Sequence, residues 1–257
     1  MSSLQAAQLI EGTENKVDNP LVCTPLIGKT EREIIREVNL IRYKRPDVVE
    51  WRADFFEDVI DNKKVMNILS KIHESIPNTS ILFTIRSEKE GGQHTSLTER
   101  EKVTLLSEVC SSGLVDFIDY ELNNKLDNVK YLRQVSLRNN VKLIISYHNF
   151  EETPKWSELI EICMSADALD ADIVKVAVMP NCNEDAIELL LATQKLKNTI
   201  KAEIVAISMG KYGAISRLFG WIFGSAMTFG IGDQSSAPGQ IPIEDLRKVI
   251  EITQKYV

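Results

Sequence analysis

Short apolar runs and longer amphipathic segments alternate along most of this chain, and the alternation limits the possible folds more than any other feature of the sequence. Each apolar run has the length of a buried strand. Each segment that follows repeats apolar residues every three to four positions, as a helix with one buried face does. Eight such pairs occur between residues 20 and 257. They predict an α/β protein made of successive βαβ units.

The expected strands cover, in chain order, residues 20–27, 47–54, 80–86, 115–122, 141–148, 172–180, 202–209 and 225–231. A helix is expected after each strand, with starts near residues 30, 61, 98, 127, 156, 183, 214 and 242. Thr30 and Thr98 are each followed three residues later by a glutamate, the pattern of a capping box. Asn183 is the expected cap of the sixth helix, and Pro242 suits the start of the last.

Closure into a single-domain (β/α)8 TIM barrel is the most economical arrangement of these units. Successive strands start roughly 22 to 35 residues apart, the length of a right-handed βαβ unit, and eight is the number that a barrel needs. A doubly wound open sheet is the alternative, but no glycine-rich GxGxxG pattern follows a strand. We expect residues 20–257 to form the barrel and residues 1–19 to be an N-terminal leader or a closure of the barrel bottom.

Composition excludes several classes of function. The net charge is −7 and no dense basic tract occurs, so we expect neither a nucleic acid nor a membrane surface as a partner. The four cysteines lack CxxC spacing and there are only three histidines, which argues for reduced thiols and against a zinc site built by the protein. No signal peptide or membrane-spanning run is evident, and we expect a cytoplasmic protein.

Lys175 interrupts the apolar run DIVKVAVMP, which covers residues 172–180. A lysine of this kind often lies at a strand end and extends its amine to water. Here apolar residues lie on both sides of it in the sequence, so we expect the amine to be buried. An unpaired buried ammonium costs several kcal/mol, whereas a neutral amine is a nucleophile. The lysine therefore predicts covalent chemistry if other strands bring acids, bases and anion-binding groups to the same place.

Polar residues at period-two spacing end five successive expected strands. In a barrel the active site lies at these carboxyl ends. The residues, in chain order, are Glu50, Arg52, Thr84, Arg86, Asp119, Glu121, Ser146, His148 and Lys175. Oppositely charged residues among them could instead form buried ion pairs with only a structural role. For Glu50, Arg52 and Asp119 that alternative stays open.

His148 and Lys175 end neighbouring strands, which places an imidazole base beside a nucleophilic amine. This pair predicts Schiff-base catalysis, in which a carbonyl condenses with the lysine and the histidine removes the acidified α proton. Arg217 follows the seventh strand and is suited to bind a carboxylate, and the stretch GIGDQSSAPGQIP forms a loop over the barrel mouth. An exposed helical arginine and a simple turn are the alternative interpretations of these two features.

The segments EWRAD, TIRSEKEGG, SYHNF, VKVAV, SMGKYG, SRLFG, TFG and SSAPGQI occur in this order and resemble type I 3-dehydroquinate dehydratase. The resemblance covers the chain from residue 20 to residue 257. It implies a barrel, usually a homodimer, that uses no cofactor and no metal. The implied reaction is a hydro-lyase step of the shikimate pathway, the dehydration of 3-dehydroquinate to 3-dehydroshikimate in chorismate and aromatic amino acid biosynthesis.

The resemblance also implies a role for individual residues. Lys175 corresponds to the Schiff-base lysine, His148 to the general acid and base, and Glu90 to a helper carboxylate near that histidine. The implied substrate-binding residues are Glu50, Arg52, Arg86, Arg217, Ser236, Gln240, Met209 and Phe229. Ile207 and Trp221 depart from what some relatives carry at these positions, without touching the lysine and histidine.

The mechanism expected from these residues begins with attack of Lys175 on the C3 ketone. His148 then removes a C2 proton and protonates the departing C1 hydroxyl. Asp119 is expected to face the barrel interior from the neighbouring strand and to orient His148. Two alternatives remain open. One is a class I aldolase, which also forms a Schiff base but cleaves a carbon–carbon bond. The other is a barrel that binds a metabolite without catalysis.

Overall fold

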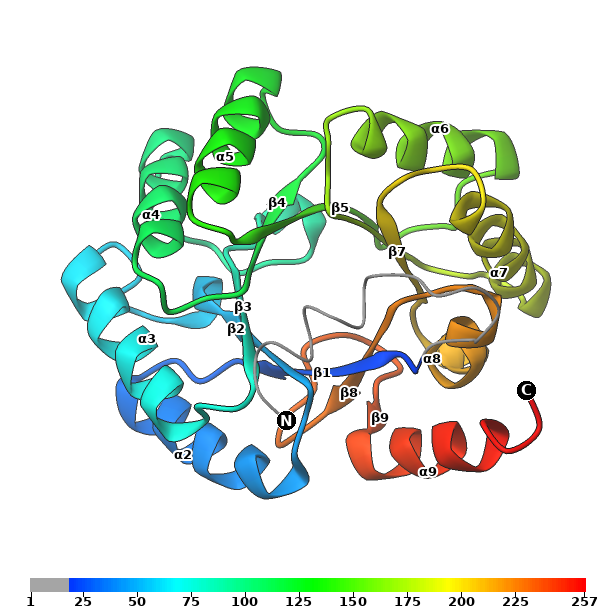
Figure 1. Ribbon diagram of the computed structural model, residues 1–257, viewed down its shortest axis with the longest axis horizontal. Helices are drawn as coiled ribbons and strands as arrows, with labels where there is room; N and C mark the ends of the chain where they lie inside the picture. Colours follow the sequence, from blue (N-terminus) through cyan, green and yellow to red (C-terminus); the bar gives the residue numbers. More distant parts are fainter. Residues whose placement is uncertain (1–18) are drawn as a thin grey trace.

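The structure is a computed structural model that describes residues 19–257, and it is a single-domain (β/α)8 barrel (Figure 1). Parallel strands occupy the centre and helices surround them. The strands are β1 (Leu21–Leu26), β2 (Val48–Arg52), β3 (Ser80–Thr84), β4 (Phe117–Glu121), β5 (Lys142–Asn149), β6 (Ile173–Val178), β7 (Glu203–Ser208), β8 (Met227–Ile231) and β9 (Ile241–Pro242). The helices are α2 (Glu31–Ile41), α3 (Asn62–Ser75), α4 (Glu99–Ser111), α5 (Leu126–Arg138), α6 (Trp156–Asp167), α7 (Asn183–Lys197), α8 (Ala214–Phe219) and α9 (Ile243–Thr253). The predicted fold class is confirmed.

The strands follow the order β7-β6-β5-β4-β3-β2-β1-β8-β9, and every pairing is parallel. The barrel closes between β7 and the residues just before β8, where Ile204 and Ser225 form a parallel bridge. The backbone N–H of Ala226 donates to the Ile204 carbonyl at 2.8 Å. This closure brings the loops after β6, β7 and β8 to the same end of the barrel as those after β2 to β5.

The ends of several elements differ from the sequence-based expectation. Asn183 is the first residue of α7 and not its cap, because Cys182 occupies the cap position and the Asp185 carboxylate accepts its N–H. Thr30 accepts the N–H of Glu33, but the Glu33 carboxylate accepts from Lys29 instead, so of the two expected capping boxes the one at Thr98 forms and the one at Thr30 does not. A ninth strand, β9, was not expected. It lies at the far end of the mouth loop, where Ile241 pairs with Gly230.

The core has two layers because strand residues alternate between the two faces of the sheet. Residues on the outer face, such as Trp51, Phe83 and Val176, pack against the helices. Those on the inner face fill the barrel, and the apolar ones include Cys23, Leu82, Phe117, Ile144, Ile173, Val205 and Met227. One inward position further along the chain, β3, β4, β5 and β6 carry the polar residues Thr84, Asp119, Ser146 and Lys175. The apolar layer therefore closes the floor of a polar site at the carboxyl ends of the strands.

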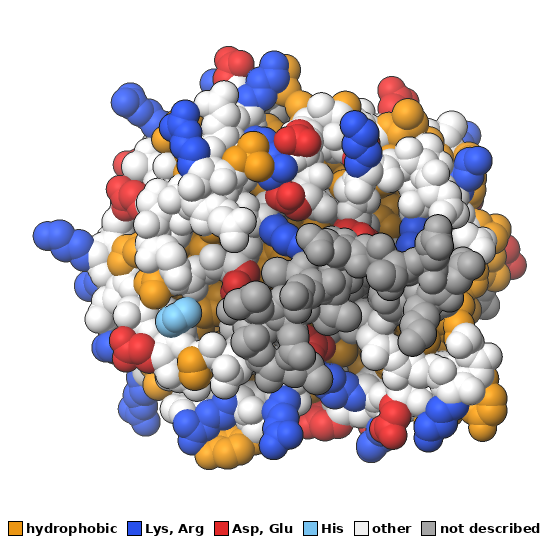
Figure 2. Space-filling view, in the orientation of Figure 1, with side chains coloured by type: hydrophobic (Ala, Val, Ile, Leu, Met, Phe, Trp, Pro, Cys, Tyr) orange, Lys and Arg blue, Asp and Glu red, His pale blue; other side chains and the backbone are white. Residues whose placement is uncertain are grey.

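The described surface carries both signs of charge. On the face shown in Figure 2, Lys and Arg side chains are interspersed with Asp and Glu side chains and do not gather into one basic patch. No helix within residues 19–257 has the length and hydropathy needed to cross a membrane. Residues 1–18, and with them most of the expected leader or bottom closure, lie outside the described residues.

Candidate active site

Lys175 lies on the inner face of β6 and is 5% exposed. Its Nζ is 3.4 Å from Glu50 Oε1 and 3.5 Å from Asp119 Oδ2, and it lies 4.4 Å from the centroid of the Phe229 ring. The expected burial of the amine is confirmed. Glu50 on β2 and Asp119 on β4 reach the barrel axis at the level of the amine, so the ammonium has two carboxylate partners in the ligand-free protein.

His148 and Glu90 form a second buried pair. Glu90 Oε2 lies 2.9 Å from His148 Nδ1 and accepts the backbone N–H of the same histidine at 3.1 Å. Glu90 ends the short 3-10 helix η3 (Glu88–Glu90) that follows β3, and Gly91 closes this turn with a φ of +81°. Because Glu90 occupies Nδ1, the ring nitrogen left for a ligand is Nε2.

The pKa values of Glu90 and His148 are shifted in opposite directions from their ordinary values. Burial raises the pKa of Glu90 to about 7, although the nearby Arg86 guanidinium opposes the shift. Burial lowers the pKa of His148 well below its usual range, and the positive charges of Arg86 and Lys175 lower it further. At neutral pH the imidazole is therefore uncharged and able to accept a proton.

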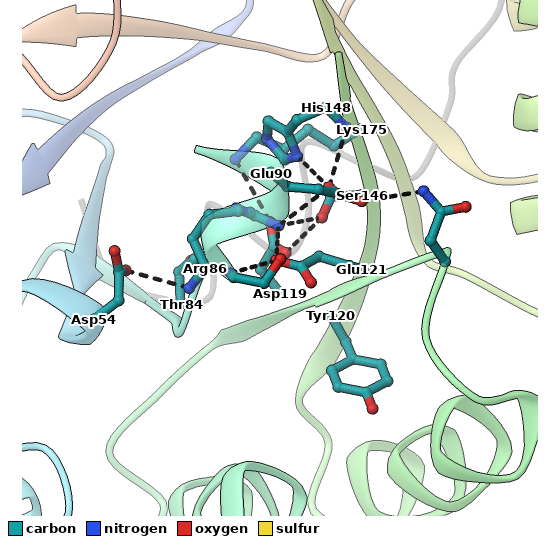
Figure 3. A network of polar contacts seen from close by, with 12 residues as sticks. Asp54, Thr84, Arg86, Glu90, Asp119, Tyr120, Glu121, Ser146, His148 and Lys175 are labelled. Atoms are coloured by element: carbon teal, nitrogen blue, oxygen red, sulfur yellow. Dashed lines mark hydrogen bonds and ion pairs between the residues drawn. The ribbon is translucent and has the colours of Figure 1, made fainter. Parts of the chain in front are cut away.

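Arg86 is the centre of the polar network (Figure 3). Its guanidinium donates to Asp119 Oδ2 and to Ser146 Oγ, both at 2.7 Å, and to Glu121 Oε1 at 3.4 Å. Burial lowers the pKa of Arg86, but Asp119 and Glu121 outweigh this effect and leave it above its usual range. Burial likewise raises the pKa of Asp119, yet Arg86 and Lys175 reverse the shift and leave it below its usual range. These charges stabilise one another.

Asp119 does not orient His148, contrary to the sequence-based expectation. Its carboxylate is engaged by Arg86, Ser146 and Lys175, whereas Glu90 holds the imidazole. The strand register explains the difference. Asp119 pairs with Ile144, which lies four residues before His148 on β5, so Asp119 sits deeper in the barrel than the histidine.

Arg52 is held by a partner that sequence reasoning missed. Its Nε and Nη2 donate to the two oxygens of Asp54, both at 2.8 Å, in the bidentate geometry that favours an arginine–carboxylate pair. Asp54 also accepts the backbone N–H of Arg86 at 3.2 Å and that of Gln93 at 3.0 Å. Asp54 is the last residue of the EWRAD segment and follows Arg52 by two positions, and this local spacing was the available signal.

Arg217 lies on α8, is 2% exposed, and pairs with no carboxylate among residues 19–257. Its Nη1 donates to the Phe229 carbonyl and its Nη2 to the Pro238 carbonyl, both at 3.2 Å, while its Nε is buried without a partner. Burial lowers the pKa of Arg217 to about 10. A buried cation that faces only carbonyl groups is suited to receive an anionic ligand.

One cavity at the carboxyl ends of the strands joins these groups and contains about 470 Å³ of space free of protein atoms. Every residue with a predicted catalytic or substrate-binding role lines it, whereas Asp119, the expected orienter of His148, does not. The lining residues are Glu50, Arg52, Arg86, Glu90, Gly91, His148, Phe150, Lys175, Ala177, Ile207, Met209, Arg217, Phe229, Ser236, Ala237 and Gln240. Among those that sequence reasoning missed, Phe150 is the largest, and it follows His148 by two positions. No group of three or more metal-ligating side chains occurs in the described part of the chain.

The mouth loop lies over this cavity and is held by its own polar contacts. Ser236 donates its N–H to Gln240 Oε1 at 2.9 Å, and Gln240 Nε2 donates to Ser236 Oγ at 3.3 Å. The Pro238 carbonyl accepts from Gly210 N–H at 3.1 Å as well as from Arg217. The loop therefore reaches the buried arginine through its backbone.

The fold and site together define a single-domain barrel enzyme with a buried lysine and a histidine–carboxylate pair in one cavity. The family model described as type I 3-dehydroquinase matches residues 22–257, and the chain belongs to this family. A 3-dehydroquinate dehydratase of Geobacillus sp. (strain WCH70) is 46% identical over 257 residues, which is 100% of this chain and 99% of that protein. The chain is an enzyme of the 3-dehydroquinate dehydratase class.

Two solved structures are similar along nearly the whole chain. The 3-dehydroquinate dehydratase of Geobacillus kaustophilus HTA426 has a TM-score of 0.90 at 42% identity and covers 92% of each chain. The type I 3-dehydroquinate dehydratase of Clostridium difficile, with covalently modified comenic acid, has a TM-score of 0.89 at 38% identity. This similarity covers 93% of the present chain and 94% of the other.

Proposed function

We propose that this protein converts 3-dehydroquinate to 3-dehydroshikimate through a Schiff base on Lys175, as a step of the shikimate pathway. The observation that carries the proposal is the placement around one cavity of the Lys175 amine, the His148 imidazole and the Arg217 guanidinium, which has no carboxylate partner among residues 19–257. A keto acid presents a carbonyl for the first group, an acidic proton for the second and a carboxylate for the third. The family and the covalently modified ligand in the Clostridium difficile protein support the same chemistry.

In the first step the Lys175 amine attacks the C3 ketone, and loss of one water gives the iminium. Lys175 must first lose a proton from its ammonium form. Asp119 is a poor acceptor because its pKa lies below the usual range, which leaves Glu50, at 3.4 Å, as the nearest acceptor. The cation–π contact with Phe229 supports the positive charge of the iminium at the same place.

In the second step His148 Nε2 removes the C2 proton, and the electron pair moves into the iminium. The resulting imidazolium returns that proton to the C1 hydroxyl, which leaves as water, and a second water hydrolyses the conjugated imine to release the enone and the lysine. The net change is the loss of one water from the substrate. Glu90 supports the imidazolium because its carboxylate accepts from Nδ1.

Arg217 binds the substrate carboxylate in this scheme. The buried Nε of Arg217 has no partner in the described residues, and burial lowers the pKa of Arg217 to about 10. A bound anion would therefore offset the electrostatic cost of burying the guanidinium. Ser236 and Gln240 then close over the ligand and donate to its hydroxyls. Glu50, Arg52, Arg86, Met209 and Phe229 form the remaining walls.

Borohydride trapping tests the proposal directly. The protein is incubated with 3-dehydroquinate, reduced, digested and analysed by peptide mass spectrometry. We expect one reduced adduct, on the peptide that contains Lys175, and none in Lys175→Ala. An adduct on another lysine, or the absence of any adduct together with normal enone formation, would refute the Schiff-base mechanism. A cleaved carbon–carbon bond in the product would favour the aldolase alternative.

The assembly and the location complete the proposal. We propose a homodimer, as the family resemblance implies, and a cytoplasmic location, as expected from the sequence. Sedimentation equilibrium at micromolar concentration tests the first point, and a species of twice the 29.0 kDa chain mass is the expected result. Cell fractionation tests the second.

A further inference from the structure

Lys102 is a buried lysine that the mechanism above does not use. It lies on the outer helix α4, yet only 7% of its side chain is exposed. Its Nζ is 3.7 Å from Glu121 Oε2 and 5.8 Å from the centroid of the Tyr120 ring. An ammonium is rarely kept this deep without a structural or functional reason.

Glu121 connects this lysine to the active site. While Oε2 faces Lys102, Oε1 accepts the backbone N–H of Ser87 at 2.7 Å and lies 3.4 Å from Arg86 Nη1. Figure 3 shows Glu121 beside Arg86. Ser87 is the cap of the 3-10 helix η3, and its carbonyl accepts the N–H of Glu90 at 3.0 Å. One carboxylate thus joins α4 to the turn that carries the partner of His148.

Asn123, two residues after Glu121, supports the same turn. Its Nδ2 donates to Glu90 Oε1 at 3.3 Å, which leaves Oε2 for His148. Lys102, Glu121, Asn123, Glu90 and His148 all line one cleft on the outer side of the active-site cavity. The end of β4 therefore holds Glu90 directly through Asn123 and holds its turn through the contact of Glu121 with Ser87.

We propose that Lys102 is a positioning residue for the reaction. Through Glu121 it holds Arg86 and the η3 turn, and its charge adds to that of Arg86, which Glu121 shares with Asp119, in balancing a carboxylate close to Glu90 and His148. The inference rests on the proposed function, because it assigns the lysine a part in the acid–base step. The physical basis is that the two opposite charges of an ion pair largely cancel at a neighbouring titratable group. Either charge alone would shift the pKa of that group more strongly.

The charges around the pair determine the expected signs. Arg86, Glu121 and Asp119 act on Glu90, and Arg86, Lys175, Asp119 and Arg52 act on His148. Further charged or titratable residues line the outer cleft, namely Glu88, Lys89, His94, Glu99, Tyr147 and Glu151. Glu121 disfavours the Glu90 carboxylate, so neutralising Glu121 lowers the apparent pKa of the Glu90–His148 pair, and removing Lys102 raises it.

The test compares Lys102→Met and Glu121→Gln with two controls. Lys102→Arg restores the charge, and Arg133→Met removes a mostly buried cation of α5 that pairs with Asp170 and Asp172. The first readout is the imidazole ¹⁵N titration of His148 in the ligand-free protein, which is resolvable because the chain has only three histidines. The second is the pH profile of kcat for 3-dehydroquinate, and the third is the thermal midpoint.

We expect Lys102→Met to raise the apparent pKa of the pair by roughly half a unit to one unit, and Glu121→Gln to lower it by a similar amount. Lys102→Arg should return it to the wild-type value. Arg133→Met should lower the thermal midpoint without moving the titration. Shifts in the same direction in both test variants, or no shift in either, would overturn the inference. Wild type without dehydratase activity would instead refute the proposed function, since the ligand-free titration requires no turnover.

Discussion

Glu90 Oε2 bonds both the Nδ1 atom and the backbone N–H of His148, at 2.9 Å and 3.1 Å. The two residues come from the ends of β3 and β5, which are separated in the sheet by β4. Because one oxygen holds both groups, the ring has a fixed orientation, and its free nitrogen faces the cavity. The two groups are close enough to titrate as a coupled pair.

The raised pKa of Glu90 predicts a cost to stability. A carboxyl whose pKa rises from 4.5 to about 7 on folding stabilises the fold while protonated, and this contribution is lost as the pH rises from below 4.5 through 7. Glu90→Gln removes the titration. We expect the variant to match wild type at pH 4.5 and to exceed it by about 3 kcal/mol at pH 8 in urea unfolding. The exposed control Glu151→Gln should give the wild-type pH dependence, and a Glu90→Gln difference that does not change with pH would contradict the prediction.

The buried charge of Arg217 should lower the stability of the ligand-free protein and raise its affinity for the substrate. Arg217→Met removes a buried charge that has no carboxylate partner among residues 19–257, so the thermal midpoint should stay equal or rise. The KM for 3-dehydroquinate should increase by roughly 10- to 100-fold, the value of a charge-assisted contact. The exposed neighbour Lys211 supplies the control Lys211→Met, which should change neither quantity. An unchanged KM in Arg217→Met would remove the arginine from the carboxylate site.

Gly91 should be needed for catalysis more than for folding. A Cβ at this position would lie 2.3 Å from the Phe150 ring, and φ is +81°, so Gly91→Ala must displace either the ring or the turn that carries Glu90. We expect kcat to fall at least roughly tenfold, because a small displacement of an acid–base pair is enough for that loss. Gly113→Ala is the matched control. It has a φ of +72° and open space around the Cβ, so it should cost about 1 kcal/mol of stability and leave kcat unchanged.

The two carboxylates beside Lys175 predict a non-additive stability effect. Lys175→Met leaves Glu50 with the Thr84 hydroxyl at 3.1 Å, while Asp119 still has Arg86. We expect the single variant to lose roughly 3 kcal/mol of unfolding free energy at pH 7, as when one partner of a buried pair is removed. The double variant Lys175→Met/Glu50→Gln should recover most of it in the same denaturant titration. Equal losses in both would show that Glu50 does not depend on the ammonium.

Much of the site followed from period-two spacing within strands. Glu50, Arg86, His148 and Lys175 share the inward parity of barrel strands, and the structure places all of them around one cavity. The loop residues Glu90, Ser236 and Gln240 line the same cavity, although only family resemblance indicated them. Their catalytic and binding roles stay predictions until the variants are measured.

The sequence by itself determined the barrel, the strand ends that carry charge and the family, because hydrophobic periodicity and strand count are local properties. Only the tertiary structure decided which charges meet. Register places Asp119 below His148, the turn after β3 brings Glu90 to the imidazole, and burial leaves Arg217 facing carbonyls without a carboxylate. These pairings depend on the relative height of side chains from different strands and loops. That height is set by barrel closure and by the loops, not by any spacing along the chain.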